Sequence, residues 1–292
     1  MSHLTPQPPQ VPRYRGFHRV GGRYGITIGS FGRQVSATPE VGPLLAFVLA
    51  SLAAVAALLA RVGGLGLGRD MLVVAVRAAA QLTAVSLLIA AVLRSAGLTA
   101  AFIAGMVVIA VVTAGRRITG SARGPGWWTA LPITAGVAPV LGLLMATSLV
   151  PARTVSVLPI AGIFIGGAMS ATGLTGRRAL DELATRRGEY EGGLALGLPP
   201  RDAALEVCRS SAALALFPVL DQTRTVGLVT LPGAFVGVLL GGADPVEAGA
   251  VQLLVLIGLL AIESIAVLIT LELVARGRLD GAASYRRQMN GH

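Results

Sequence analysis

The sequence predicts an all-α integral membrane protein with about seven transmembrane helices and a cytoplasmic helix-turn-helix segment. Hydrophobic residues make up 54% of the chain and charged residues only 13%, whereas soluble domains carry about 25% charged residues. The mean hydropathy is +0.74, and uncharged runs of about 20 residues, the length that a bilayer core requires, recur along the chain. Because only helices and closed barrels satisfy their backbone in lipid, these runs predict membrane-spanning helices.

The apolar runs are separated by short stretches that are rich in arginine, glycine or proline. We expect spans near 43–60, 71–93, 97–114, 128–149, 155–175, 225–242 and 248–273. The apolar piece from Ser210 to Leu220 is too short to cross alone and contains Pro218. We therefore expect this piece to lie at the interface or to lead into the sixth span.

The domain organisation follows from these spans. Residues 1–42 are rich in Gly, Pro and Arg without an apolar period, so we expect a disordered polar tail. Residues 43–275 form the transmembrane domain, which includes a cytoplasmic segment at about 177–209. Residues 276–292 form a C-terminal cytoplasmic tail.

The arginines predict the orientation, because an excess of positive charge in short loops marks the cytoplasmic side. Loops 61–70, 115–127 and 176–209 carry 15 arginines together with the C-terminal tail. Loops 94–96, 150–154 and 243–247 carry 2. We expect a multi-pass protein of the cell membrane with its N-terminus outside and its C-terminus in the cytoplasm. The five arginines of the opening tail oppose this placement.

Several chemistries are excluded by residue content. All 24 basic residues are arginine, so the chain has no phosphate-binding loop that ends in Gly-Lys-Ser or Gly-Lys-Thr. Cys208 is the single cysteine, and His3, His18 and His292 lie in the tails, so no Cys/His zinc cluster is expected. The net charge of +10 is explained by arginines that flank apolar runs. We expect lipid surroundings, no nucleic-acid partner and no cofactor in this chain, and the residues leave any metal ligand unassigned.

The stretch "EYEGGLALGLPPRDA", Glu189 to Ala203, interrupts the apolar sequence. As a helix it places Glu191, Leu194 and Leu198 on one face, and the Gly197 to Pro200 sequence predicts a turn before a second short helix. A small apolar face flanked by acids suits docking into a groove of a soluble partner. A solvated connector is the alternative, but a connector has no need for several exposed leucines.

Six residues of this stretch are the candidates for partner coupling. The leucines supply apolar contacts, and the acids favour the first helical turn and meet basic groups on the partner. The glycine permits the turn that aims the segment. These candidates are Glu189, Glu191, Leu194, Leu196, Gly197 and Leu198.

Some residues of the second and fifth spans are candidates for the translocation path. Arg77 and Gln81 are four apart on one helix face, and an intramembrane charge is costly and marks a functional candidate. Arg77 is also close enough to the cytoplasmic end to snorkel, so anchoring and a pathway role both stay open. Gly162 and Gly166 form a small-xxx-small pair that indicates close packing, a dimer interface or a moving seam. Met169 is a core residue or a soft ligand.

Other candidates lie in the sixth and seventh spans. Asp221 and Arg224 are three apart and can neutralise each other. They precede Pro232 and Gly233, whose break in the helix predicts a hinge on the transport path. Glu263 lies in an apolar run, so it must face a partner, water or substrate, or else be protonated.

Four stretches in order carry a resemblance to a known family. They are "VRAAAQL" at Val76 to Leu82, "LPIAGIFIGGAMSATGL" at Leu158 to Leu174, the docking stretch, and "FPVLDQTRTVGLVTLPGAFVGVLLGGADPVEAGAVQ" at Phe217 to Gln252. The docking stretch looks like the coupling segment of ABC-transporter permeases. Together the four are similar to the FetB-like metal-export permeases, whose plant relatives are linked to aluminium tolerance. Members of that family often carry Asn where Gly167 stands and a Met pair where Ala234 and Phe235 stand.

The resemblance implies the permease subunit of an ABC exporter, with iron as the first expected substrate. Such a subunit pairs with a second copy of itself and with a separate ATPase, which binds the ATP and Mg²⁺, so the chain itself is not an enzyme. The alternative is a secondary transporter in which Glu263 or Arg77 couples transport to an ion gradient. A membrane scaffold is a third reading, but it leaves the Pro232 break and the intramembrane charges without a purpose.

Overall fold

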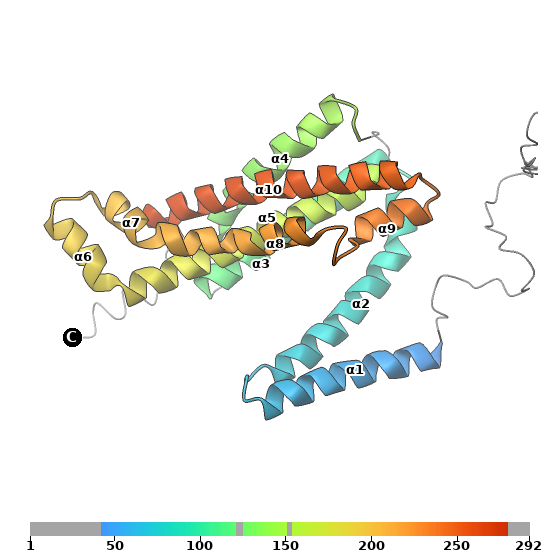
Figure 1. Ribbon diagram of the computed structural model, residues 1–292, viewed down its shortest axis with the longest axis horizontal. Coiled ribbons are helices and arrows are strands. Elements are labelled where there is room, and N and C mark those ends of the chain that lie inside the picture. Colours follow the sequence, from blue (N-terminus) through green and yellow to red (C-terminus); the bar gives the residue numbers. More distant parts are fainter. Residues whose placement is uncertain (1–41, 121–124, 151–153, 280–292) are drawn as a thin grey trace, which may run out of the picture. The chain divides into compact units, whose positions relative to one another are not determined.

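The computed structural model describes residues 42–120, 125–150 and 154–279, and the regular structure of these residues is helical. The elements are α1 Pro43–Val62, α2 Gly68–Val92, α3 Ala96–Thr119, η1 Pro125–Thr129, α4 Ala130–Ala146, α5 Thr154–Thr185, α6 Arg187–Ala195, α7 Pro200–Ala213, η2 Leu214–Leu216, α8 Phe217–Thr225, α9 Gly233–Leu240 and α10 Pro245–Ala275 (Figure 1). Apart from Gly42, the expected N-terminal tail lies outside the described residues, as do residues 280–292 of the C-terminal tail.

The chain divides into two units, residues 1–50 and 51–292. The described part of the first unit is Gly42 and the beginning of α1, where Leu44, Phe47 and Leu49 are exposed apolar side chains. The second unit contains the rest of α1 and all the other described elements.

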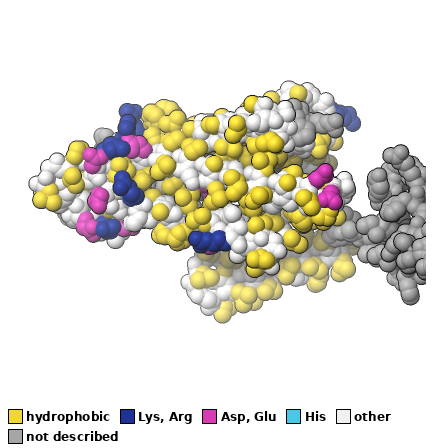
Figure 2. Space-filling view, turned by 45° about the horizontal axis from the view of Figure 1, so that its top comes forward, with side chains coloured by type: hydrophobic (Ala, Val, Ile, Leu, Met, Phe, Trp, Pro, Cys, Tyr) yellow, Lys and Arg dark blue, Asp and Glu magenta, His cyan; other side chains and the backbone are white. Residues whose placement is uncertain are grey.

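Within the described ranges, seven helical stretches are long and apolar enough to cross a membrane. They are Pro43–Val62, Gly68–Val92, Ala96–Thr119, Gly126–Ala146, Val155–Thr185, Pro200–Thr225 and Pro245–Ala275. This confirms the predicted class, an all-α integral membrane protein with seven candidate spans. Figure 2 shows charged side chains gathered at the end built by α6 and α7, and a largely hydrophobic surface along the helices.

The sixth span differs from the prediction. The expected run 225–242 is not one helix, because α8 ends at Thr225 and α9 begins only at Gly233. Gly227 has a φ of 77°, and Pro232 is extended with φ −65° and ψ 149°, so the intervening turn cannot continue the helix. The sixth candidate span is Pro200–Thr225 instead.

The chain is helical without interruption from α7 to the end of α8, although Pro218 lies in this stretch. Pro218 lies in the first turn of α8, where a missing N–H costs no helical hydrogen bond. The three residues of η2, a tighter 3₁₀ turn, join α7 to α8. The piece that was expected to be too short to cross is therefore the middle of a longer helical run.

The core lies where α5 and α10 pack against each other, with α3 and α4 on α5, α4 and α7 on α10, and α9 beside α10. Phe164, Ile133 and Ile262 are fully buried in this core. Glycines allow close approach: a Cβ on Gly258 would lie 2.7 Å from Cζ of Phe164, and one on Gly136 would lie 2.9 Å from the Ile262 carbonyl oxygen. Close packing of this kind holds helices together in lipid, where apolar transfer contributes little.

Candidate functional site

The docking stretch folds as a helix, a turn and a second helix, and we call residues 187–203 the knob. The turn is closed by two hydrogen bonds, from Gly197 N to Leu194 O at 3.0 Å and from Leu198 N to Gly193 O at 3.1 Å. Gly197 has a φ of 87°, which glycine adopts without strain. This pair of bonds and the left-handed glycine form a Schellman motif, so α6 ends at a defined turn.

The leucines of the knob are exposed to different degrees. Leu196 is 87% exposed and Leu198 is 43% exposed, while Leu194 is half-buried. Leu198 also lies over α6, because a Cβ on Gly193 would be 3.4 Å from its Cδ1. The tip of the knob therefore presents Leu196 to its surroundings and uses Leu198 partly for its own packing.

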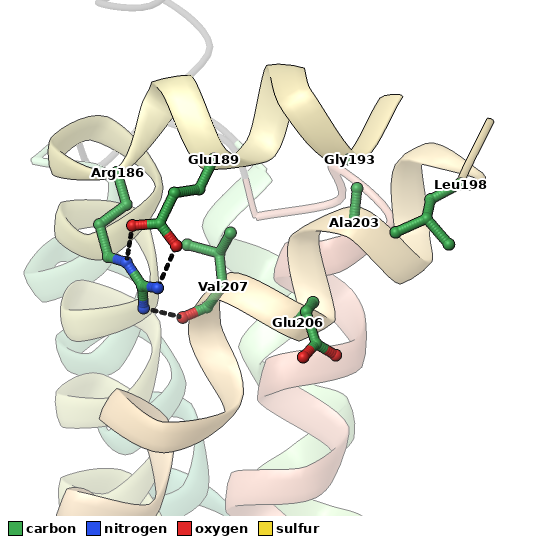
Figure 3. Close-up of a pocket in the computed structure, with 7 residues that line it drawn as sticks. All are labelled: Arg186, Glu189, Gly193, Leu198, Ala203, Glu206 and Val207. Carbon is green, nitrogen blue, oxygen red and sulfur yellow. Dashed lines mark hydrogen bonds and ion pairs between the residues drawn. The ribbon is translucent and has the colours of Figure 1, made fainter. Parts of the chain in front are cut away.

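Arg186, immediately before α6, organises the base of the knob (Figure 3). Its Nε donates to Glu189 Oε1 at 2.8 Å, and a second guanidinium N–H pairs with the other oxygen of the same carboxylate. Its Nη1 donates to Glu182 Oε1 and to the Val207 carbonyl, each at 3.4 Å. One side chain thus joins α5, α6 and α7.

Around this arginine lies a small hollow between α6 and α7. Its lining residues are Arg186, Glu189, Gly193, Leu198, Ala203, Glu206 and Val207. The hydrogen bonds and charge of Arg186 hold the pKa of the Glu189 carboxyl below its ordinary value. Both groups are consequently ionised over the whole neutral range.

The two acids of α6 each pair with an arginine of the same chain. Glu189 pairs with Arg186, and Glu191 accepts from Arg187 Nε at 2.7 Å. The prediction that these acids meet basic groups on a partner stays a prediction. Arg186 was not among the predicted site residues, although acids four residues before and three residues after it are a visible signal in the sequence.

A second ion pair joins the knob to α10 of the core. Arg201, in the first turn of α7, donates through Nε and Nη2 to the two carboxylate oxygens of Glu272 on α10, at 2.6 and 2.8 Å. Glu272 also accepts from Arg276 Nε at 2.6 Å. The Arg201 tie was missed as well, since 71 residues separate it from Glu272 and no local pattern predicts the pair.

The stretch from α8 to the start of α9 holds the other candidates of that region. Asp221 and Arg224 form an exposed pair at 3.4 Å. Pro232 is the N-cap residue of α9, so the break falls between two helices rather than inside one. Pro232 offers no capping side chain, and the buried Gln252 of α10 accepts from Phe235 N at 3.2 Å instead. The predicted hinge stays a prediction, now placed between α8 and α9.

Glu263 lies inside the packed seam between α5 and α10. It is 8% exposed, and a Cβ on Gly167 would lie 2.8 Å from its Oε1. Met169 is half-buried and packs against the same core. Gly166 faces open space, because a Cβ there would meet nothing within 4 Å. No ion pair in the described ranges joins Glu263 to Arg77.

Arg77 and Gln81 lie on α2, where both side chains are exposed. Arg77 borders a shallow apolar hollow formed by Leu72, Val73, Val76 and Ala80. Across the part of the chain that the structure describes, no three His, Cys, Asp or Glu side chains come together as metal ligands.

Seven candidate spans, charged ends and a wide apolar surface define a multi-span helical membrane protein. The chain belongs to the uncharacterised protein family UPF0014, whose sequence profile matches residues 44–278.

The chain is similar to three relatives, of which one is named as a membrane protein and another as a probable iron export permease. The chain is 35% identical over 218 residues to the UPF0014 membrane protein STAR2 of Oryza sativa subsp. japonica, covering 74% of this chain and 76% of that protein. It is 38% identical over 151 residues to the protein ALUMINUM SENSITIVE 3 of Arabidopsis thaliana, covering 52% and 55%. It is 34% identical over 146 residues to the "Probable iron export permease protein FetB" of Escherichia coli (strain K12), covering 50% and 56%. No solved structure matches the chain.

Proposed function

We propose that this chain is the membrane subunit of an ABC transporter that exports a metal cation, and that a separate ATPase docks on the knob. The name of the Escherichia coli relative supports iron as the first substrate to test. The name of the Arabidopsis thaliana relative supports a link to aluminium. ATP and Mg²⁺ belong to the ATPase, so this chain transports and does not hydrolyse.

The knob is the observation that carries this proposal. Figure 1 places α6 and its turn at one end of α5 and α10, and Leu196 is 87% exposed among charged side chains there. A leucine held at the tip of an ordered turn suits an apolar pocket on a partner. The loops that carry most arginines include this segment, which supports a cytoplasmic position for it.

The ties at the base of the knob explain how docking would act on the membrane helices. Arg186 joins α6 to α5 through Glu182, and Arg201 joins α7 to α10 through Glu272. A force on the knob therefore reaches α5 and α10, the two helices at the centre of the core. This supports coupling of an ATPase cycle to movement along the α5 and α10 seam.

The test is recovery of a co-expressed ABC ATPase subunit with the detergent-solubilised chain. Burying one leucine contributes about 1.5–3 kcal/mol, so Leu196→Asp should weaken association at least about tenfold. The matched control is Leu65→Asp, which changes a leucine that is 64% exposed in the loop between α1 and α2. Equal recovery with the parent chain and with Leu196→Asp would remove the docking role.

A second copy of the chain is the other proposed partner. In the described part of α2 only Val92 is buried, while Arg77 stands exposed within an apolar helix. An exposed intramembrane arginine needs a polar neighbour or water, and a path shared with a second copy supplies one.

The second candidate function is a secondary transporter coupled to an ion gradient. The buried Glu263 favours it, because an intramembrane acid is a typical ion-coupling group. This candidate predicts transport by the chain alone in vesicles with an imposed gradient and without ATP. The ABC proposal predicts no transport under those conditions.

A further inference from the structure

We propose that Glu263 is a proton-binding site in the seam between α5 and α10, neutral while the helices are packed and ionised when the seam opens. The inference does not depend on the ATPase partner, because it concerns only the chain's own core. It assigns a ligand, the proton, to a position that the docking proposal does not use.

The geometry of the seam depends on a glycine. A Cβ on Gly167 would lie 2.8 Å from Glu263 Oε1 and 2.6 Å from Leu259 Cδ2. The carboxyl group therefore occupies the space that any side chain at position 167 would need. Glu263 is 8% exposed, so its carboxyl group is packed into the space next to Gly167.

Among the residues that the structure describes, no charged side chain forms an ion pair with Glu263. Of the elements packed against α10, α4, η2 and α9 contain no titratable side chain. On α5 the nearest charged residue is Arg177, about ten residues beyond Gly167 and about 15 Å along the axis. It is exposed and donates to the Arg117 carbonyl.

Apart from Arg178, whose buried Nη1 has no hydrogen-bond partner among the described residues, the titratable groups of the remaining elements are engaged elsewhere or face outward. On α7, Arg201 and Asp202 pair with each other, and Cys208 donates to the Ala179 carbonyl. Glu206 and Arg209 are exposed. The other such groups are Arg178, Asp181 and Glu182 towards the end of α5, Asp221 and Arg224 on α8, and Glu247 and Glu272 at the two ends of α10.

An ionised carboxylate without a partner or water is strongly disfavoured in such a site, so the packed seam selects the neutral acid. Opening the seam hydrates the group and selects the carboxylate. Each opening then releases one proton from Glu263 and each closing takes one up. A conformational change that opens and closes α5 against α10 is thereby linked to proton binding.

The experiment is infrared spectroscopy of the full chain reconstituted in lipid at neutral pH. The parent chain should show the C=O absorption of a neutral carboxylic acid, and the near-isosteric Glu263→Gln variant should lose it. Gly167→Ala should abolish or shift the band, because its Cβ displaces the carboxyl. Gly166→Ala is the matched control and should leave the band unchanged, since its Cβ meets nothing within 4 Å.

Three results would overturn the proposal. They are the absence of the band in the parent chain, its persistence in Glu263→Gln, and an unaltered band in Gly167→Ala. The Glu263→Gln comparison keeps the test decisive even if the alanine at position 167 prevents folding.

Discussion

Arg201 holds both carboxylate oxygens of Glu272, with Nε 2.6 Å from Oε1 and Nη2 2.8 Å from Oε2. This fork joins the first turn of α7 to the end of α10 across 71 residues of sequence. A planar guanidinium matches a carboxylate in this way and a lysine ammonium does not. The pair therefore fixes the angle at which the knob leaves the core.

Replacing Arg201 by lysine should keep the charge and lose the fork. A partly exposed pair contributes only modestly to stability, so amide hydrogen exchange in the first turns of α7 should become about two- to fivefold faster. The control is Arg224→Lys, because the Asp221 pair is about 70% exposed and single-bonded at 3.4 Å. Unchanged exchange in Arg201→Lys would show that the fork does not hold the knob.

Acidification should loosen α6 through Glu189. The folded-state pKa of Glu189 is lowered from 4.5 by the hydrogen bonds and charge of Arg186. A group with a lowered folded pKa stabilises the fold fully above its ordinary value, and this contribution disappears as the pH falls through the lower folded value. We therefore expect α6 to become more mobile below about pH 4.5 and not at higher pH.

The measurement is the electron paramagnetic resonance mobility of a nitroxide on a cysteine introduced at Ala195. Cys208 is buried, so the label goes to the new position. Glu189→Gln should already be mobile at neutral pH and lose the acid transition. Glu191→Gln is the control and should keep it, because Glu191 pairs with Arg187 within α6. A transition that survives in Glu189→Gln would exclude this carboxylate as its source.

Hydropathy predicted the membrane class and most spans because long uncharged runs have few alternatives in lipid. The prediction of the sixth span was wrong because the same criterion favours uncharged runs and rejects a span that begins with charged residues. The start of Pro200–Thr225 carries Arg201, Asp202, Glu206 and Arg209, which a local hydropathy reading excludes from a span. In the structure this charged start lies at the α6 end, where the helix leaves the apolar region.

The sequence predicts those parts of the site whose conformation depends on neighbouring residues in the chain. The Gly197 turn follows from a glycine before two prolines, since few other residues accept a φ of 87°. Gly167 and Glu263 were each noted in the sequence, but for unrelated reasons. Their contact depends on how α5 packs against α10, which no pattern along the chain specifies.

Gln252→Met should loosen α9 without changing the size of the side chain. The Gln252 side chain accepts from Phe235 N at 3.2 Å, and an unpaired N–H in a half-buried position costs about 1–3 kcal/mol. Exchange of the Phe235 amide should therefore become at least about fivefold faster. Gln222→Met, which changes an exposed glutamine of α8, should leave it unchanged. Pro232→Ala should have a smaller effect, because Pro232 lies before α9 and interrupts no helix.

Two of the glycines of the knob, Gly192 and Gly197, should respond to alanine with opposite signs. Gly192 lies within α6, and a Cβ there meets nothing within 4 Å, so alanine should stabilise the helix by up to about 1 kcal/mol. Gly197 has a φ of 87°, where a Cβ costs about 1–2 kcal/mol. Amide exchange in α6 should be slower in Gly192→Ala and about five- to thirtyfold faster in Gly197→Ala.

The β-branched variant Gly197→Val should go further and misdirect Leu196, so that recovery of the ATPase falls as it does in Leu196→Asp. The corresponding Gly192→Val leaves the turn intact and should recover the ATPase as the parent chain does. If Gly197→Ala and Gly192→Ala changed α6 exchange in the same direction, the turn would not depend on the left-handed glycine. If Gly197→Val recovered the ATPase fully, the direction of the turn would not matter for docking.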